Sequence, residues 1–468
     1  MFPWYSQYLN RPKAIALQDM QGNVFTWLEL KQKIDVVTHY LQQQGVKKNS
    51  GIALCGKNSF ELLLFYLSAI QLGARVMGLN PAFSAQKCFE ICKQNNIAYC
   101  YVEEGSWHYN SIVLKALSFP IRDRLFPILE SELDIITLDS KQPSTMTLTS
   151  GSTGIPKAVV HSIQAHLDNA KGVCQLMDFQ AQHSWLLSLP LYHVSGQGII
   201  WRWLLTGATL HLAQSDFYKS LTQVTHASLV PTQAQRFLNF LAENPTQTYK
   251  TQQILLGGAM IPLNLTNALT KKGILSYTSY GMTEMASTVF AKKSDHRNGV
   301  GQPLSGREYQ LIDEEIYLRG AGLALGYWKN GQIESFCNDQ GWFATKDKGI
   351  WKNNELVILG RQDNMFISGG ENIQPEEIEK VILQYSEVKQ VFVLPMQDHE
   401  FGERPVAMIQ FTTSFSENNI GKLKNWLQHK LEKFKQPIGY FPLEIEKYQQ
   451  GNIKVSRQQL KKQLAQMI

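Results

Sequence analysis

Residues 145–159 read Thr-Met-Thr-Leu-Thr-Ser-Gly-Ser-Thr-Gly-Ile-Pro-Lys-Ala-Val. An alternating apolar run through Met146 and Leu148 is followed by small and hydroxyl-bearing residues, and Pro156 and Lys157 end the segment. Glycines let the backbone approach a ligand closely and expose its N–H groups, and serine and threonine hydroxyls add donors. We interpret the segment as a strand and a loop that wraps a polyphosphate, with Lys157 as the compensating charge.

The spacing in this loop differs from that of a Walker A loop. That motif requires Gly-x-x-x-x-Gly-Lys-Ser/Thr, whereas here Lys157 follows Pro156 and precedes Ala158. A flexible Ser/Gly linker is the alternative, but such linkers rarely lie between a strand and an apolar segment. The residues that we expect to bind the triphosphate are Thr149, Ser150, Gly151, Ser152, Thr153, Gly154 and Lys157.

The composition is that of a globular protein with more than one domain. The chain has 468 residues, of which 44% are hydrophobic and 18% charged, and this length exceeds what one hydrophobic core usually serves. Its apolar stretches, such as residues 62–72, are too short or too interrupted to span a bilayer. The N-terminus has neither the basic nor the apolar region of a signal peptide. We therefore expect a cytoplasmic protein without membrane insertion.

The cysteine pattern and the net charge indicate which kinds of metal ion, ligand or macromolecule the chain can bind. The six cysteines form no zinc-like pairs; Cys88 and Cys92 lie one helical turn apart, but no histidine or second cysteine pair accompanies them, so we expect free thiols in a reducing cytosol. The net charge of +6 is mild and suits ATP, coenzyme A and carboxylic acids, or simply a generic surface. No basic run interleaved with aromatic residues indicates nucleic acid. The sequence is compatible with a homo-oligomer.

Apolar runs alternate with helical patterns over the first three hundred residues, which indicates parallel β/α units. The expected strands are 51–55, 74–79, 97–102, 145–149, 185–189, 209–212, 227–230, 254–256 and 274–279. Residues 24–45 are expected to form a strand entry and an amphipathic helix, and the other expected helices are 60–72, 164–177, 198–205, 231–241 and 262–272.

Beyond residue 300 the pattern changes to short alternating strands at 308–312, 315–318 and 355–359, as in a small antiparallel, barrel-like portion. After Arg361 we expect a helix at 375–384, strands at 388–394 and 405–411, a charged helix at 417–434 and a C-terminal helix. We therefore predict an N-terminal domain over residues 1–361 and a C-terminal domain over 362–468. About one hundred residues is an ordinary size for a small domain.

A second motif, Tyr-Gly-Met-Thr-Glu, occupies residues 280–284 after an expected strand. We expect Tyr280, Gly281 and Met282 to bind the nucleotide, since the ring of Tyr280 can stack on a purine and Gly281 permits a tight turn. Thr283 can donate to a phosphate, and Glu284 can hold Mg²⁺, which usually takes one or two protein carboxylates. The alternative is a helix start with Thr283 as N-cap.

These segments resemble motifs of the adenylate-forming superfamily, which contains acyl-CoA synthetases, peptide-synthetase adenylation domains and luciferases. The resemblance implies an α/β adenylate-forming fold, with a large N-terminal domain of parallel β/α layers, a barrel-like β portion and a small mobile α+β C-terminal domain. It implies that MgATP adenylates a carboxylic acid and that coenzyme A receives the acyl group. The loop Gly257, Gly258 and Ala259 would lie behind the adenine.

Later segments continue the resemblance and supply further site residues. Asp347 corresponds to an aspartate that binds the ribose hydroxyls, although Lys346 stands where the family has glycine, and Arg361 would contact ribose and phosphate. Asp363 lies at the hinge position. Gly369 and Gly370 would line the pantetheine tunnel.

The segment Gly-Asn-Ile-Lys-Val-Ser-Arg, residues 451–457, resembles the segment that carries the catalytic lysine. It implies that Lys454, with Thr283 and Glu284, forms the catalytic group. The common form of this segment has a glycine where this chain has Ile453. An isolated lysine in a basic C-terminal segment is otherwise only a solvated charge, and it is the order of the upstream motifs that favours the catalytic role.

The acid is the harder part of the prediction. The segment at 189–198 resembles an acyl-pocket motif, in which His193 and Ser195 would border the acid, although His193 is equally well a packed core residue. Arg202 lies within the apolar run Ile-Ile-Trp-Arg-Trp-Leu-Leu, where a charge is costly unless it pairs with an anion. A second carboxylate on the substrate suits Arg202, and an internal ion pair is the alternative.

This combination of segments resembles the o-succinylbenzoate–CoA ligases of menaquinone (vitamin K2) synthesis, a family of acid–thiol ligases within the superfamily. It implies 2-succinylbenzoate, ATP and coenzyme A as substrates, with Arg202 on the aromatic carboxylate. Another aryl- or fatty-acyl-CoA ligase is the nearest alternative. A catalytically silent AMP-binding protein is a more distant one, which the departures at Lys346 and Ile453 would favour.

Overall fold

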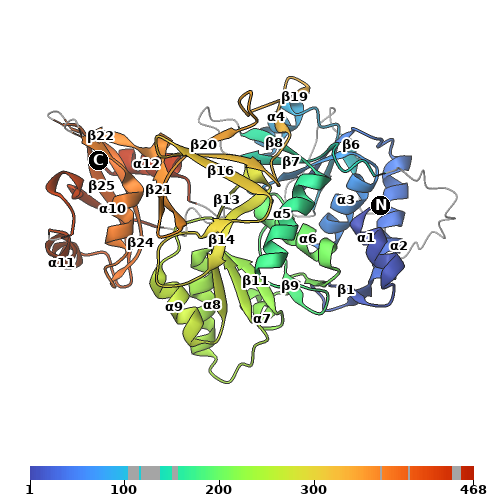
Figure 1. Cartoon of the computed structure of the whole chain (residues 1–468), viewed down its shortest axis with the longest axis horizontal. Helices are drawn as coiled ribbons and strands as arrows, with labels where there is room; N and C mark the ends of the chain where they lie inside the picture. Colours follow the sequence, from blue (N-terminus) through green and yellow to red (C-terminus); the bar gives the residue numbers. More distant parts are fainter. Residues whose placement is uncertain are drawn as a thin grey trace. The chain divides into compact units, whose positions relative to one another are not determined.

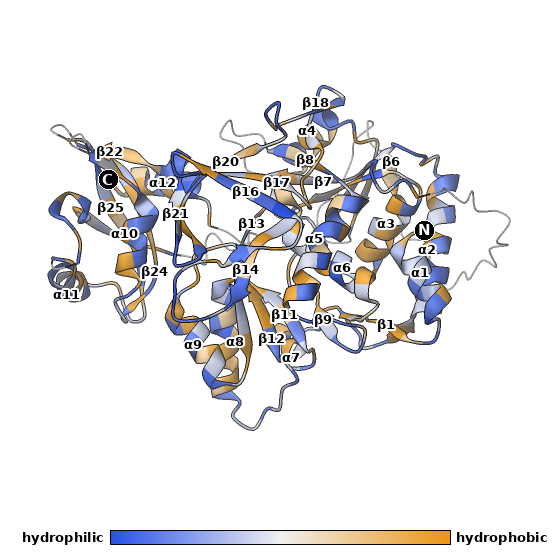
Figure 2. Cartoon of the chain, in the orientation of Figure 1, coloured by the Kyte–Doolittle hydropathy of each residue, from blue (hydrophilic) through white to orange (hydrophobic). Residues whose placement is uncertain are grey.

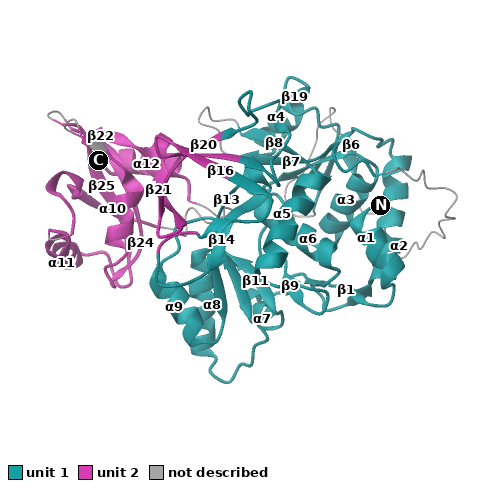
Figure 3. Ribbon diagram, viewed as in Figure 1, with its two compact units in different colours: residues 1–297, 301–308, 319–343 teal, residues 298–300, 309–318, 344–468 magenta. Residues whose placement is uncertain are grey.

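The fold contains two compact units. The structure is a computed structural model, and it describes residues 1–103, 115–117, 138–149, 156–368, 371–398, 401–428, 430–444 and 455–468. Unit 1 contains residues 1–297, 301–308 and 319–343, and unit 2 contains 298–300, 309–318 and 344–468 (Figure 3). The predicted domain boundary after Arg361 falls inside unit 2 and stays a prediction.

A nine-stranded sheet forms one layer of unit 1. From edge to edge its strands are β15 (Gln302–Pro303), β14 (Ser287–Lys293), β13 (Leu275–Met282), β12 (Gln253–Leu256), β11 (His226–Leu229), β9 (Ser184–Leu186), β10 (Thr209–His211), β1 (Ile15–Gln18) and β2 (Val24–Thr26). The strands from β13 to β1 pair in parallel, and the pairs at both ends of the sheet are antiparallel. The central strands are therefore short and apolar, as in β12, which Figure 2 colours hydrophobic.

An eight-stranded sheet forms a second layer of unit 1. Its strands, in order, are β19 (Gln332–Glu334), β18 (Gly326–Lys329), β8 (Lys157–Ser162), β7 (Pro143–Thr149), β4 (Arg75–Leu79), β3 (Gly51–Cys55), β5 (Tyr99–Val102) and β6 (Lys115–Leu117). The strands from β7 to β6 are parallel, whereas β7, β8, β18 and β19 form antiparallel pairs.

Helices α5 and α6 lie between the two sheets (Figure 1). Gln197 of α6 donates to Thr147 of β7, and Arg202 of α6 donates to Ser228 of β11, so this helix contacts both layers. The helices of unit 1 are α1 (Pro3–Asn10), α2 (Trp27–Gln43), α3 (Phe60–Gln71), α4 (Ala85–Gln94), α5 (Ile163–Leu176), α6 (Val194–Thr206), α7 (Phe217–Thr222), α8 (Pro231–Glu243) and α9 (Leu263–Lys271), with a 3₁₀ turn η2 (Thr283–Met285). None of the described helices is long and apolar enough to cross a bilayer.

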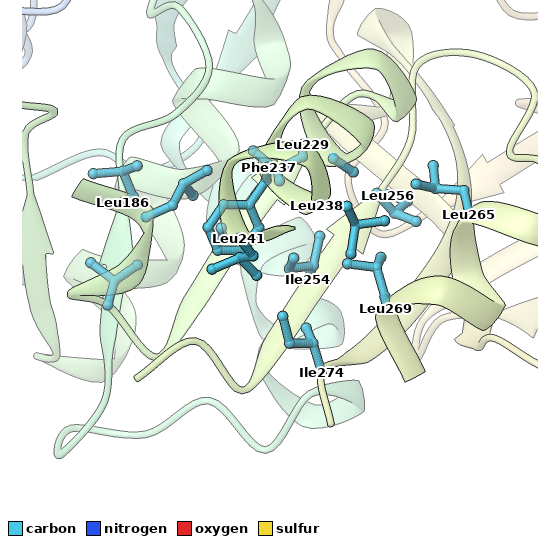
Figure 4. Close-up of a cluster of buried hydrophobic side chains, with 14 residues drawn as sticks. Leu186, Leu229, Phe237, Leu238, Leu241, Ile254, Leu256, Leu265, Leu269 and Ile274 are labelled. Carbon is cyan, nitrogen blue, oxygen red and sulfur yellow. The ribbon is translucent and has the colours of Figure 1, made fainter. Parts of the chain in front are cut away.

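A cluster of buried side chains joins α8 and α9 to the nine-stranded sheet (Figure 4). Phe237 of α8, Ile254 of β12 and Leu269 of α9 are all fully buried. Burial of each such side chain stabilises the fold by about 1.5–3 kcal/mol relative to its exposure. The packing holds the carboxyl ends of β12 and β13, where two predicted motifs begin.

Unit 2 contains most of a four-stranded sheet and a five-stranded sheet. The first consists of β16 (Arg307–Ile312), β17 (Glu315–Gly320), β20 (Phe343–Lys352) and β21 (Glu355–Arg361). The second consists of β23 (Glu371–Ile373), β22 (Phe366–Ser368), β25 (Gly402–Phe411), β24 (Val388–Asp398) and β26 (Gly439–Pro442). Helices α10 (Pro375–Ile382), α11 (Glu417–Leu427) and α12 (Arg457–Met467) and 3₁₀ turns η3 (Gln362–Asn364) and η4 (Lys433–Lys435) complete the unit.

The structure confirms the α/β class and most of the predicted elements, and it corrects several bounds. Helix α6 begins at Val194 rather than at residue 198, and α11 ends at Leu427 rather than at residue 434. Strand β13 continues to Met282, so the Tyr-Gly-Met motif lies within the strand rather than after it. The prediction missed the antiparallel strands β8 and β14.

Candidate nucleotide and acid sites

The two ends of the predicted triphosphate loop lie side by side on an antiparallel hairpin. Thr149 ends β7, Lys157 begins β8, and these two residues are paired in register. Residues 150–155 fall outside the described part of the chain, so the roles of Ser150, Gly151, Ser152, Thr153 and Gly154 stay predictions. Lys157 is exposed, as a residue that binds a phosphate must be.

The two segments that we predict to bind adenine lie at the ends of two neighbouring parallel strands. Strands β12 and β13 pair through Leu256 and Thr278, and the Ser279 hydroxyl donates to the Leu256 carbonyl at 2.7 Å. Gly257, Gly258 and Ala259 directly follow β12, and a Cβ atom at Gly257 would lie 2.8 Å from the hydroxyl of Ser279, the residue before Tyr280. Ligands of α/β sheets bind at the carboxyl ends of parallel strands, and these two segments meet at such an edge.

Gly281 is required by a close approach of the chain to itself. A Cβ atom on Gly281 would lie 2.0 Å from the carbonyl oxygen of Ser287. The intervening turn is strained, because Ala286 and Ser287 have φ of 53° and 119°, values that side-chain-bearing residues seldom adopt. Strain of this kind is concentrated at functional sites.

Thr283 does not cap a helix. It begins the 3₁₀ turn η2, whose N-cap is Met282, and this turn has no side-chain cap. The hydroxyl of Thr283 is therefore not used in the role that the alternative interpretation gave it. Glu284 is buried and accepts a hydrogen bond from the Tyr327 hydroxyl on Oε1 at 2.8 Å.

The segment that we predict to border the acid forms the turn before α6 and the first turn of that helix. His193 is the N-cap residue, and its backbone N–H donates to the Pro190 carbonyl at 3.0 Å. Ser195 lies in the first turn and is partly exposed. Gly196 fits against Pro190, whose carbonyl oxygen would lie 2.1 Å from a Cβ atom at that position.

Arg202 is buried, and no carboxylate of the described residues lies within ion-pair distance of it. Its Nη1 donates to Ser228 at 3.2 Å, and the guanidinium lies 5.1 Å from the centroid of the Trp185 ring. Burial lowers the pKa of Arg202 to about 10, so the side chain remains charged at neutral pH. The described residues therefore supply no anion for this cation, as the internal ion pair would require.

Gly198 leaves room next to this guanidinium. A Cβ atom at Gly198 would lie 3.1 Å from Nη2 of Arg202 and 3.4 Å from the hydroxyl of Ser287. Because Ser287 ends the strained turn after Glu284, Gly198 lies between the buried arginine and the segment that we predict to bind adenine. Within unit 1 the predicted acid and nucleotide segments are therefore neighbours.

Unit 2 brings Asp347, Arg361 and Asp363 together. Asp347 and Arg361 are paired across β20 and β21, with Nη1 of Arg361 at 3.2 Å from Oδ1 of Asp347. Nη2 of the same arginine lies 3.8 Å from Asp363. Lys346 has a φ of 61° and directs its ammonium to 3.6 Å from Asp363. The lysine therefore occupies a conformation that favours glycine and points toward Asp363, the predicted hinge residue.

Three predicted site residues, Gly369, Gly370 and Lys454, lie outside the described part of the chain. Their roles at the coenzyme A tunnel and in catalysis stay predictions.

The AMP-binding enzyme family model matches residues 5–328. The chain belongs to this family. Over 99% of both chains it is 54% identical to 2-succinylbenzoate–CoA ligase of Haemophilus influenzae. It is 41% identical to the enzyme of the same name from Escherichia coli, over 98% of this chain and 97% of that one.

Solved structures of AMP-binding enzymes agree with the fold. A variant of E. coli MenE with bound OSB-AMS superimposes with a TM-score of 0.88 at 39% identity, over 99% of this chain and 98% of that one. The o-succinylbenzoate CoA synthetase of Bacillus subtilis, in complex with the acyl-adenylate intermediate OSB-AMP, gives a TM-score of 0.83 at 25% identity, over 95% and 94%.

AMP-binding enzymes use ATP with Mg²⁺, and the donors near η2 suit this ion. Mg²⁺ prefers oxygen ligands and is usually held by one or two carboxylates together with substrate phosphates. Glu284 has one carboxylate oxygen fixed by Tyr327, while its other oxygen has no hydrogen-bond partner among the described residues. Glu284 would therefore hold the ion, which neutralises phosphate charge when bound.

Sequence reasoning missed His161, which supports this site of the AMP-binding enzyme. His161 is fully buried in β8, and its Nε2 lies 2.7 Å from the carbonyl oxygen of Thr283, so this nitrogen is the donor. Burial lowers the pKa of His161 to about 4, although the hydrogen bond to Thr283 opposes the shift. The neutral ring of His161 thus holds the turn that carries Thr283 and Glu284. In the sequence, the only sign of this role is a polar residue within an apolar strand.

Proposed function

We propose that the chain ligates 2-succinylbenzoate to coenzyme A at the expense of ATP, through an acyl-adenylate, in menaquinone biosynthesis. AMP and pyrophosphate are the other products. The observation that carries the choice of acid is the buried Arg202 beside Gly198, for which the described residues supply no carboxylate. A buried guanidinium is stable when an anion pairs with it, and the second carboxylate of the substrate is such an anion.

In the first half-reaction the succinyl carboxylate attacks the α-phosphate of ATP. Tyr280 stacks on the adenine, while Asp347 and Arg361 bind the ribose. The loop at 149–157 holds the leaving pyrophosphate, and Lys454 bridges the developing negative charge. No covalent enzyme nucleophile is needed, because positioning and electrostatic stabilisation supply the catalysis.

In the second half-reaction the thiol of coenzyme A attacks the acyl carbon and AMP leaves. A C-terminal domain over residues 362–468 rotates about Asp363, which withdraws Lys454 and brings Gly369 and Gly370 to the pantetheine tunnel. Glycines leave the tunnel free of side chains. Conformational steps of this kind commonly separate the half-reactions of an enzyme.

The aromatic carboxylate binds Arg202, with His193 and Ser195 at the border of the acid pocket. We propose that the enzyme acts in the cytoplasm on these small molecules and binds no nucleic acid. A homo-oligomer is compatible with this function.

ATP–pyrophosphate exchange with a panel of acids tests the proposal. We expect exchange with 2-succinylbenzoate and at most weak exchange with benzoate, succinate or fatty acids. Equal exchange with the monocarboxylic acids would favour another acyl-CoA ligase. No exchange with any acid would indicate a catalytically silent AMP-binding protein.

A further inference from the structure

Tyr327 lies between two oppositely charged residues of the nucleotide site. Its hydroxyl donates to Oε1 of Glu284 at 2.8 Å, and the Nζ atom of Lys157 lies 5.0 Å from the centroid of its ring. The two contacts use different parts of the same side chain. The hydroxyl binds the carboxylate, and the π face attracts the ammonium.

The backbone fixes Tyr327 in this place. Strand β18 pairs with β8 in a register that sets Tyr327 opposite Val159, close to Lys157. Gly326 has a φ of 147°, and a Cβ atom there would lie 2.3 Å from the Glu334 carbonyl oxygen, so no other residue fits. The position of the Tyr327 side chain is therefore set by a strand of the sheet and not by a loop.

Glu284 is bound to the same segment a second time. The backbone N–H of Ala324 donates to the carbonyl oxygen of Glu284 at 2.8 Å. Both the main chain and the carboxylate of Glu284 are thus held by residues 324–327. Both donors are neutral groups, so neither forms an ion pair with Glu284.

The described residues offer neither Glu284 nor Lys157 an ion-pair partner within the protein. If the Glu284 carboxylate and the Lys157 ammonium formed an ion pair, the carboxylate would be less available to a metal ion and the ammonium less available to a phosphate. A neutral hydroxyl instead orients the carboxylate without neutralising it, and hydrogen bonds to a metal-binding carboxylate tune its affinity for the ion.

We propose that Tyr327 is a positioning residue that keeps Glu284 and Lys157 apart, so that the first binds Mg²⁺ and the second binds the phosphates of ATP. The inference rests on the proposed function, because it assigns both residues to MgATP. It concerns the nucleotide and is independent of which acid the enzyme activates.

Binding of nucleotides to Tyr327→Phe, measured by calorimetry without acid or coenzyme A, tests the proposal. The variant keeps the ring under Lys157 and loses the hydrogen bond to Glu284. We expect about 10-fold weaker binding of MgATP, in line with the loss of a partner of a metal-binding carboxylate. Binding of AMP, which needs no metal ion, should stay within about twofold of the wild type. Tyr327→Leu, which also loses the ring, should weaken MgATP further.

Tyr249→Phe is the matched control, because the Tyr249 hydroxyl donates to the Lys272 carbonyl at 2.7 Å, away from these motifs. It should leave both affinities unchanged. Unchanged MgATP binding by Tyr327→Phe, or equal losses for AMP and MgATP, would overturn the proposal, since equal losses indicate a general disturbance of unit 1. Exchange activity of the wild type with 2-succinylbenzoate tests the proposed function separately.

Discussion

Arg457 donates from its Nη2 atom to both carboxylate oxygens of Glu379, at 2.6 and 2.8 Å. Its Nη1 donates to the Val393 carbonyl at 2.7 Å, and the Val393 N–H donates to Oε1 of Glu379 at 2.6 Å. The three residues form a closed network that joins the start of α12 to α10 and β24. Arg457 lies three positions after Lys454 in the sequence, so this network anchors the chain next to the predicted catalytic lysine.

Arg457→Met should destabilise the protein. It removes the cation from the buried Glu379 and leaves a carboxylate without its partner, which costs about 3 kcal/mol in the free energy of unfolding. Urea unfolding measures the change. Lys435→Met is the matched control, because Lys435 binds the exposed Glu377 at 2.9 Å and such a pair contributes less than about 1 kcal/mol. Equal losses in the two variants would contradict the role of the buried network.

Glu379 should make stability depend on pH in a direction that can be checked. Burial raises the pKa of Glu379 from 4.5 to about 7, although Arg457 opposes the shift. A group with a raised pKa in the folded state stabilises that state most below its unfolded value, and the contribution is lost as the pH rises through the folded value. The difference in unfolding free energy between the wild type and Glu379→Gln should therefore fall between about pH 4.5 and pH 7. A difference that grows with pH would show that Arg457 outweighs burial.

The sequence predicted elements best where burial is complete. Strand β3 has the predicted bounds, because all five of its residues are buried and its apolar run is unbroken. Strand β8 was missed because the buried polar residues His161 and Ser162 hide its pattern. Helix α6 was predicted too short because Gly196 and Gly198 lower helix propensity, while the packing of Gly196 on Pro190 overrides it.

The candidate site was predictable where one segment carries the chemistry. The Thr283–Glu284 pair and Lys157 stand in motifs, and in the structure Glu284 and Lys157 contact the same side chain, Tyr327. Tyr327 was not predictable, because its partner Glu284 is 43 residues away and no motif joins them. The left-handed conformation of Lys346 could be predicted only from the family motif, which has a glycine at this position.

Lys346→Gly should stabilise unit 2. Lys346 has a φ of 61°, which costs a side-chain-bearing residue about 1–2 kcal/mol, whereas glycine adopts it freely. Glycine loses more backbone entropy on folding, so the net gain should be about 0.5–1 kcal/mol. The exposed contact with Asp363 that is lost contributes little. Thermal unfolding measures the change, and Lys348→Gly, at a strand position without positive φ, should be destabilising. A destabilised Lys346→Gly would contradict the argument.

Arg202→Ala should raise the KM for 2-succinylbenzoate about 100-fold, which corresponds to about 3 kcal/mol for a lost buried charge pair. The KM for ATP should change little. The matched substrate is 4-oxo-4-phenylbutanoate, which lacks the ring carboxylate, and with it wild type and variant should have similar KM values. Steady-state kinetics of both enzymes with both acids give four KM values, from which the coupling between Arg202 and the ring carboxylate follows. A loss of the same size with both acids would show that Arg202 supports the fold and does not bind the ring carboxylate.

Lys454→Ala should separate the two half-reactions. It removes the ammonium group that we propose stabilises the developing negative charge at the α-phosphate, so the rate of acyl-adenylate formation should fall at least about 100-fold. Thioester formation from supplied acyl-adenylate should be nearly unchanged, because the lysine is withdrawn in that step. Pyrophosphate exchange reports the first step, and release of the thioester from synthetic acyl-adenylate reports the second. Lys461→Ala removes an exposed charge from α12 and should affect neither step. Equal losses in both steps would refute the alternation of the C-terminal domain.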